Sequence, residues 1–315
     1  MEEAAHWAAE RLGCDTLQLR PVSGDASFRR YFRCEWRGRS LVLMDAPPEK
    51  EHSAPFVDID RRLRRAGLNA PEIMHFDLEL GYGLMQDFGD VLYRDLLNEH
   101  NADDLFPGLF DILERFAADV DPAGLPPYSA GSLQFELDLF PDWYLDRDRG
   151  RSLTSAERTD WTELCARLID SAQHQPQVFV HRDFHSCNLL QDGAAPGIID
   201  FQDGVRGPLS YDLVSLLWDR YITWPRPRLE AWMSTMHARY GLDCAPAEWV
   251  RQCDWMGLQR NLKIVGIFAR LEHRDGKRGY LAMVPRFYGY LRDVAARYTE
   301  FGALQRLLED SRCAP

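Results

Sequence analysis

The fold of this chain is decided by the stretch His181-Arg182-Asp183-Phe184-His185-Ser186-Cys187-Asn188 together with Gly197-Ile198-Ile199-Asp200-Phe201. Two short apolar runs, residues 178–180 and 197–201, flank the polar loop between them, as buried strands flank a loop. The loop offers an aspartate and, five residues later, an asparagine. A second aspartate follows after a hairpin, at the end of the second predicted strand.

These three residues have the chemistry that phosphoryl transfer requires. One carboxylate must orient the attacking hydroxyl and accept its proton, and Asp183 suits that catalytic role. An amide oxygen and a second carboxylate must hold hard magnesium ions against a triphosphate, and Asn188 and Asp200 suit that metal-binding role. The sequence therefore predicts a site for phosphoryl transfer at this loop.

Outward from the loop, the apolar spacing predicts two lobes. Residues 2–12 have helical spacing and end at Gly13. Shorter periods predict an antiparallel meander of strands at 17–22, 28–36 and 40–44, with a turn at 23–27. A helix at 56–65 and two short strands at 73–76 and 83–85 follow. Beyond residue 88 the pattern is mainly helical, at 92–97, 105–120, 133–143, 155–174 and 211–221. We expect a first lobe over residues 1–88 and a second over residues 89–315.

Composition narrows the class of protein. The 315 residues are 45% hydrophobic and carry a formal net charge of -12, which argues against a nucleic-acid partner. No apolar stretch approaches the roughly 20 residues that span a bilayer, and the acidic N-terminus is unlike a signal peptide. The seven cysteines show neither metal-site spacing nor a disulfide framework. We expect a cytoplasmic enzyme with a small-molecule substrate, without a membrane or an obligate protein partner.

The residues 181–188 resemble the catalytic loop H-R-D-x-x-x-x-N of the protein-kinase-like superfamily. Asp200-Phe201-Gln202-Asp203 stands where protein kinases carry D-F-G, and this wording is similar to the aminoglycoside phosphotransferase-like branch. The helix predicted at residue 211 leaves no room for an activation segment, so the acceptor should be small. The resemblance implies an α+β, protein-kinase-like fold with a small antiparallel-sheet N-lobe and a mainly helical C-lobe.

The same resemblance implies ATP and Mg²⁺ as cofactors. Adenine would lie against the connector at Gln86, Asp87 and Phe88, and the first hairpin, with Gly24, Arg29 and Arg30, would cover the phosphates.

One position departs from the superfamily pattern, because Met44 stands where the third strand should carry a lysine for the phosphates. Either the chain is a nucleotide-binding pseudokinase, or other cations replace the lysine. The candidates are Arg29, Arg30, Arg33 and Lys50. The intact aspartates and asparagine favour an active enzyme. The acids of the helix at 56–65, Asp58 and Asp60, would pair with that lysine, and without it we expect them to be solvated.

Within this branch the chain is similar to the bacterial anomeric kinases of cell-wall recycling, which phosphorylate the C1 hydroxyl of N-acetylmuramate and N-acetylglucosamine and whose product feeds a uridylyltransferase. The segments that carry the likeness include Met44 itself and are residues 23–31, 41–48, 135–137, 143–144 and 200–208. The expected substrate-binding residues are Glu136, Asp203 and Arg206, with Arg182 as a second candidate for the muramyl carboxylate and Trp218 as either a ring-face contact or core.

Two alternatives stay open. An aminoglycoside, choline or amino-alcohol kinase would keep the fold and change the acceptor, and a pseudokinase would bind nucleotide without turnover. His181 is expected to hold the loop rather than to react. His181 and His185 have the spacing of zinc ligands only on a helix with a third ligand, so zinc is not expected.

Overall fold

The computed structural model describes residues 1–22, 28–193 and 195–315. The predicted turn at 23–27, with Gly24, lies outside the described residues. The chain divides into two compact units, each described by itself. Unit 1 comprises Met1–Leu97, Asp103–Arg115 and Ser186–Gly204, and unit 2 comprises Asn98–Ala102, Phe116–His185 and Val205–Pro315. The expected lobe boundary at residue 88 stays a prediction.

Unit 1 is built on an antiparallel five-stranded sheet in the order β1-β2-β3-β5-β4. The predicted meander is therefore confirmed. Along β2, buried side chains alternate with more exposed ones, because successive residues of a strand point to opposite faces of the sheet. Their bounds are Arg20–Pro21 (β1), Arg30–Trp36 (β2), Arg39–Asp45 (β3), Ile73–Asp77 (β4) and Tyr82–Gln86 (β5).

The helix α1 (Glu2–Leu12) covers one face of this sheet, and its bounds match the predicted residues 2–12. Gly13 ends it at a φ of 65°, where glycine carries no Cβ penalty. The apolar face of α1 includes Trp7 and packs with Leu41 and Leu43 of β3 in one buried cluster. Residues 41 and 43 therefore point toward α1, so Met44 points to the opposite face.

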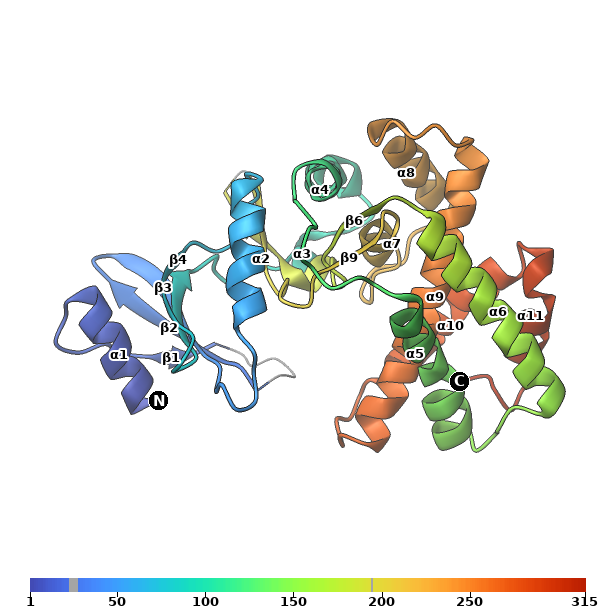
Figure 1. Cartoon of the computed structure of the whole chain (residues 1–315), viewed down its shortest axis with the longest axis horizontal. Helices are drawn as coiled ribbons and strands as arrows, with labels where there is room; N and C mark the ends of the chain where they lie inside the picture. Colours follow the sequence, from blue (N-terminus) through green and yellow to red (C-terminus); the bar gives the residue numbers. More distant parts are fainter. Residues whose placement is uncertain (23–27, 194) are drawn as a thin grey trace. The chain divides into compact units, whose positions relative to one another are not determined.

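The helix α2 (Ala54–Arg65) covers that opposite face, and Figure 1 shows α1 and α2 on opposite sides of the sheet. Phe56 of α2 lies between Phe76 of β4, with ring centroids 6.2 Å apart, and Phe201, at 4.9 Å. One turn further on, Asp60 is only 5% exposed. The expectation that this acid is solvated is wrong, because residues four apart share the inward face of a helix.

Besides the sheet and its two helices, unit 1 contains the segment that leads from the polar loop to Asp200. It contains α3 (Tyr93–Leu96), the 3-10 turn η2 (Ser186–Asn188) and the hairpin of β7 (Leu189–Asp192) with β8 (Ala195–Ile198). The strand predicted to end at Asp200 ends at Ile198 instead. Asp200 lies two residues beyond it with a φ of 62°, a left-handed conformation that aspartate tolerates better than most residues.

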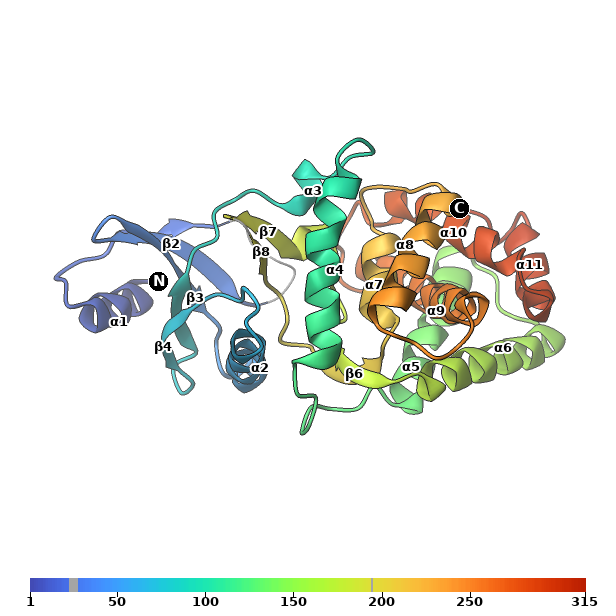
Figure 2. The same cartoon turned by 90° about the horizontal axis from the view of Figure 1, so that it is seen from above.

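Unit 2 is mainly helical, and the long helix α9 (Pro246–His273) contacts most of its other helices (Figure 2). A short strand that the sequence analysis missed, β9 (Val205–Pro208), pairs with β6 (Gln177–Val180). The helix α4 (Ala102–Ala118) contributes to both units. The other elements are α5 (Ala130–Leu139), the π-helix η1 (Phe140–Asp148), α6 (Ser155–His174), α7 (Tyr211–Leu217), α8 (Arg226–Arg239), η3 (Leu281–Met283), α10 (Val284–Ala295), η4 (Thr299–Phe301) and α11 (Gly302–Glu309).

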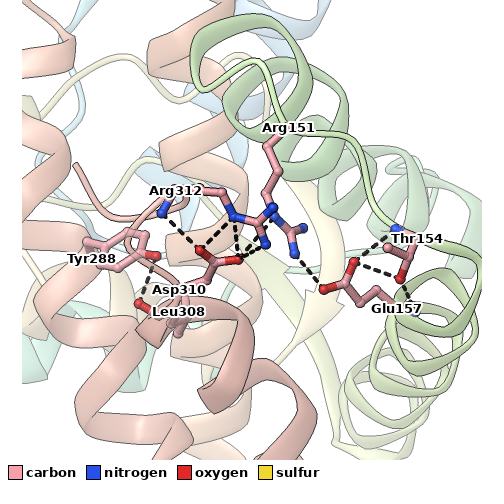
Figure 3. Close-up of polar contacts among 7 residues, drawn as sticks. All are labelled: Arg151, Thr154, Glu157, Tyr288, Leu308, Asp310 and Arg312. Carbon is pink, nitrogen blue, oxygen red and sulfur yellow. Dashed lines mark hydrogen bonds and ion pairs between the residues drawn. The ribbon is translucent and has the colours of Figure 1, made fainter.

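The end of the chain is tied to the start of α6 by the polar contacts that Figure 3 shows. Thr154 and Glu157 form a capping box at this helix, which explains why its predicted bounds are confirmed. The Arg151 Nη2 lies 2.5 Å from the Glu157 carboxylate, and its Nε lies 3.4 Å from Asp310 near the C-terminus. Arg312 also pairs with Asp310, at 2.6 Å. Throughout the part of the chain that the structure describes, no helix has the length and apolarity to cross a membrane.

Candidate active site

The first part of the predicted catalytic loop, in unit 2, leaves β6 with a strained backbone. Arg182 has a φ of 75°, a region that costs a non-glycine residue about 1–3 kcal/mol. The carboxylate of Asp212, at the start of α7, accepts the backbone N–H groups of His181 at 2.6 Å and Arg182 at 3.0 Å, which offsets that cost. His181 is 1% exposed, and its Nδ1 accepts the Asp183 backbone N–H at 3.3 Å. The predicted structural role of His181 is confirmed.

Asp183 is half-buried beside several cations of unit 2. Burial alone would raise the pKa of its carboxyl group. The positive charges of Lys263, Arg260 and Arg220 outweigh burial and hold the pKa of Asp183 well below its ordinary value. The group is therefore a carboxylate at neutral pH, which is the protonation state that a proton acceptor requires.

His185 follows Asp183 in the loop and is 4% exposed. Burial, followed by the charge of Arg220, lowers the pKa of this imidazole to about 3, so it is neutral at physiological pH. Among residues 1–22, 28–193 and 195–315 there is no group of three or more His, Cys, Asp and Glu placed to hold a metal ion.

The two predicted magnesium ligands lie together in unit 1. The Asn188 amide group is 3.4 Å from one carboxylate oxygen of Asp200, and the Gln202 amide donates to the other at 2.8 Å. The Ile199 backbone N–H also donates to the Asn188 carbonyl at 3.1 Å, which fixes the two segments side by side. One amide oxygen and one carboxylate suit Mg²⁺, which keeps water and phosphate oxygens for its remaining positions.

The connector predicted to meet adenine has three engaged side chains in unit 1. Phe88 is 8% exposed and packs against Gly197 so closely that a Cβ there would lie 2.7 Å from its ring. Asp87 accepts the Gly89 backbone N–H at 2.9 Å, and the Gln86 amide lies 3.4 Å from Asp192. These contacts hold the side chains within unit 1, and the role of this connector in adenine recognition stays a prediction.

The arginines that could replace the lysine differ in their availability. Arg33 is fully engaged: its Nε lies 2.6 Å from Asp87, and its Nη1 lies 2.7 Å from Asp90. Arg29 is buried and pairs with Glu51 at 3.2 Å. Arg30 pairs with Asp45, yet its side chain stays 57% exposed.

Lys50 lies over the ring of Phe28 at 4.9 Å, and Met44 is fully buried. Of the cations named for this role, Arg30 combines exposure with a position at the start of β2.

Glu136 of α5 is the predicted substrate residue with the most contacts. Its carboxylate lies 2.7 Å from Arg182 and 2.9 Å from the Lys263 Nζ, and it accepts hydrogen bonds from Tyr128 and, at 3.2 Å, Gln259. Burial would raise the pKa of Glu136, but Lys263 and Arg182 lower it below the ordinary value. Glu136 therefore holds two cations in place as a buried anion.

These cations line an open pocket of about 570 Å³ within unit 2. The size is within the usual range for a small-molecule site. Its walls come from α5, from Arg182 and from one face of α9. The helices α5 and α9 lie against each other (Figure 1). The lining residues are Ser129, Gly131, Ser132, Phe135, Glu136, Leu139, Arg182, Lys263, Ile267 and Arg270.

The remaining substrate candidates lie elsewhere. Asp203 is exposed in unit 1, and Arg206 is exposed on β9 in unit 2, so neither lines the pocket of Glu136. Trp218 is 1% exposed, and a Cβ on Gly257 would lie 2.6 Å from its ring, which makes Trp218 a core residue.

Sequence reasoning missed the contribution of α9. Lys263 and Arg270 are seven residues apart, so they share one face of the helix, and both line the pocket. Asp212 was also missed, although it supports the catalytic loop. The one available signal was the rarity of lysine: Lys263 is one of three lysines in the chain, and the apolar residues 264–269 follow it.

Comparison with known proteins agrees with this geometry. Residues 18–251 match the model of the phosphotransferase enzyme family. The N-acetylmuramate/N-acetylglucosamine kinase of Pseudomonas aeruginosa is 46% identical over 297 residues, which cover 92% of this chain and 88% of that protein. The kinases of the same name from Pseudomonas putida and Neisseria meningitidis are 43% and 37% identical, over 93% and 91% of this chain and 88% of each relative.

Solved structures show the same fold at low identity. The aminoglycoside phosphotransferase APH(4)-Ia, in a ternary complex with ADP and hygromycin B, has a TM-score of 0.60 at 18% identity, covering 91% of this chain and 97% of its own. An ethanolamine kinase of Plasmodium vivax has a TM-score of 0.62 at 12% identity, covering 87% and 82%. The predicted α+β, protein-kinase-like fold is confirmed.

Proposed function

Because this chain belongs to the phosphotransferase enzyme family, we propose that it transfers the γ-phosphoryl group of ATP, with Mg²⁺, to the anomeric C1 hydroxyl of N-acetylmuramate and N-acetylglucosamine. The observation that carries the proposal is the 46% identity, over nearly the whole chain, to a kinase named for these two sugars. The product would be a sugar 1-phosphate, which a uridylyltransferase could convert toward UDP-N-acetylmuramate in peptidoglycan recycling.

Asp183 is proposed as the residue that orients the acceptor hydroxyl and takes its proton. Its lowered pKa keeps it ionised at neutral pH. A weak base of this kind suits an anomeric hydroxyl, which is more acidic than an ordinary alcohol, and suits a loose transition state in which the proton leaves late. Asp212, through its hydrogen bonds to the loop backbone, would keep the carboxylate in position.

Asn188 and Asp200 are proposed to hold Mg²⁺, which would neutralise the phosphate oxygens when bound. The left-handed backbone of Asp200 and the hydrogen bond from Gln202 set the direction of its carboxylate. For the nucleotide we propose backbone contacts at Gln86, Asp87 and Phe88 and cationic contacts from Arg29 and Arg30. Arg30 is the stronger candidate for the charge that Met44 does not supply, because its side chain is exposed.

The charge of the unit 2 pocket supports a sugar acid over a cationic acceptor. Three cations, Arg182, Lys263 and Arg270, line it against the single carboxylate of Glu136. An aminoglycoside or choline would need carboxylates or an aromatic cage around its positive charge. The excess of positive charge stands out in a chain whose net charge is -12, and it favours an acceptor that is neutral or anionic.

The proposal is tested by incubating the protein with magnesium-ATP and, separately, N-acetylmuramate, N-acetylglucosamine, choline and kanamycin. We expect ADP release with the two sugars, together with loss of the reducing end and an acid-labile phosphate. Asp183→Asn should lower kcat by about 100- to 10,000-fold, since it removes the proton acceptor. Asp170→Asn, on the exposed face of α6, is the matched control and should leave kcat unchanged.

Two other outcomes would refute different parts of the proposed function. ADP release with choline or kanamycin alone would refute the sugar assignment and leave the kinase family intact. Nucleotide binding without turnover of any acceptor would instead favour a pseudokinase.

A further inference from the structure

The cations of the unit 2 pocket are not equivalent. Arg182 and Lys263 both share the carboxylate of Glu136, at 2.7 and 2.9 Å. Arg270 lines the same pocket outside this pairing, and its Nε, like that of Arg182, is buried with no hydrogen-bond partner among the described residues. A buried guanidinium N–H without a partner is costly, so this group is placed for a ligand that supplies an acceptor.

The surroundings of Arg270 leave its charge uncompensated. Burial lowers its pKa, and the nearby positive charge of Arg274 lowers it further, with only Asp275 opposing them. Asp275 is itself engaged by Arg274, at 2.7 Å. The planar guanidinium fork matches a carboxylate in geometry, which makes an anionic group the natural partner at this end of the pocket.

The spacing along α9 fits the size of one sugar. Lys263 and Arg270 lie on one face of the helix, two turns or about 10 Å apart along its axis. Lys263 is close enough to Asp183 that its charge lowers the pKa of that carboxyl group. A hexose whose reactive hydroxyl lies near Asp183 would therefore extend along the helix toward Arg270. The 63%-exposed ring of Phe135 offers an apolar wall beside it.

We propose that Arg270 binds the lactyl carboxylate of N-acetylmuramate and so determines how strongly the protein prefers this sugar over N-acetylglucosamine. The two sugars differ only in the lactyl group on O3. This inference rests on the proposed function. In this arrangement Arg182 and Lys263, neutralised in part by Glu136, serve both sugars, and Arg270 serves only the acidic one.

The test compares kcat/KM for the two sugars in Arg270→Gln. The value for N-acetylmuramate should fall about 10- to 100-fold, the loss expected for hydrogen bonds to a charged group. The value for N-acetylglucosamine should change less than about threefold. Arg270→Lys should restore part of the loss, because it returns the charge without the planar fork. Arg251→Gln, near the start of α9 and outside the pocket lining, is the matched control and should leave the ratio between the sugars unchanged.

A neutral substrate gives an independent arm. The methyl ester of N-acetylmuramate should be used by the wild-type protein about as poorly as the acid is used by Arg270→Gln. For Arg270→Gln, kcat/KM with the ester should be about the same as kcat/KM with the acid, because the substitution and the esterification remove the same contact.

The outcomes separate this inference from the proposed function. Equal losses for both sugars in Arg270→Gln, or a further loss with the ester, would overturn the assignment of Arg270 while the sugar kinase stands. A wild-type protein that phosphorylates neither sugar would refute the proposed function and this inference with it. Thermal unfolding of each variant checks that a loss of activity does not reflect loss of the fold.

Discussion

Two equally buried carboxyl groups, one in each unit, have pKa values shifted in opposite directions. Asp60 on α2 of unit 1 and Glu136 on α5 of unit 2 are each 5% exposed. Burial raises the pKa of Asp60 to about 7, and Arg64 and Arg61 oppose it only in part. Burial acts on Glu136 in the same direction, but Lys263 and Arg182 reverse it and lower the pKa.

The difference lies in the partner, since the degree of burial is the same. Asp60 lies on the side of the sheet toward which Met44 points, and methionine cannot supply a cation. One of its carboxylate oxygens has no hydrogen-bond partner in the described part of the chain. Glu136 has partners on both oxygens. A buried acid with only more distant cations thus moves toward its neutral form, and one paired with two cations stays ionised.

Glu136→Gln should have the largest effect on stability, because it leaves Lys263 and Arg182 buried without their counter-ion. Breaking a buried ion pair in this way costs about 3–5 kcal/mol, measured as the free energy of unfolding in urea. Glu248→Gln breaks a half-exposed pair with Arg251 and is the control, with an expected cost below about 1 kcal/mol. A loss of less than about 1 kcal/mol in Glu136→Gln would contradict the role of this carboxylate.

Asp60→Asn should have a smaller effect that depends on pH. Between about pH 4 and pH 7 folded wild-type protein keeps a proton on Asp60 that the unfolded chain has released, so stability falls as the pH rises through this window. Asparagine does not titrate. The free energy of unfolding of the variant, relative to that of wild type, should therefore increase by up to about 4 kcal/mol when the pH is raised from about 4.5 to about 8.

Urea unfolding at the two pH values measures this gain. Asp58→Asn, on the half-exposed side of the same helix and paired with Arg62, should change the free energy of unfolding by less than about 1 kcal/mol at either pH. If Asp60→Asn follows wild type across the window, Asp60 is not the neutral buried acid described above.

Gly266→Ala should have the smallest effect of the three and would disturb the contact between α5 and α9 that brings Glu136 to Lys263. A Cβ at this position would lie 2.6 Å from the Leu139 Cβ at the end of α5. Overpacking of this kind costs about 1–3 kcal/mol in thermal or urea unfolding. Gly289→Ala, in α10, would place its new Cβ with no other atom within 4 Å and should instead stabilise by about 0.5–1 kcal/mol. Changes of the same sign in both variants would contradict the close approach.

Local chemistry explains which elements could be predicted. The helices α1 and α6 match their predicted bounds because a glycine ends the first and a capping box begins the second. The meander was predictable because period-2 alternation is a property of neighbouring residues. Asp60 was placed wrongly for the opposite reason: a charged residue in a charged helix gives no local sign that its face is covered by the sheet.

What the sequence determined by itself is the chemistry of the loop from His181 to Asn188, with Asp200 and the neutral Met44, and through it the family. These features are a matter of residue type and spacing along the chain, so they need no coordinates. The tertiary structure alone decided the charge of the unit 2 pocket. Glu136 meets Arg182 across 46 residues and Gln259 across 123, and Arg270 joins them from the far end of α9. Such groups come together only when helices distant in sequence pack to bury their apolar faces. A local sequence pattern does not predict these long-range contacts.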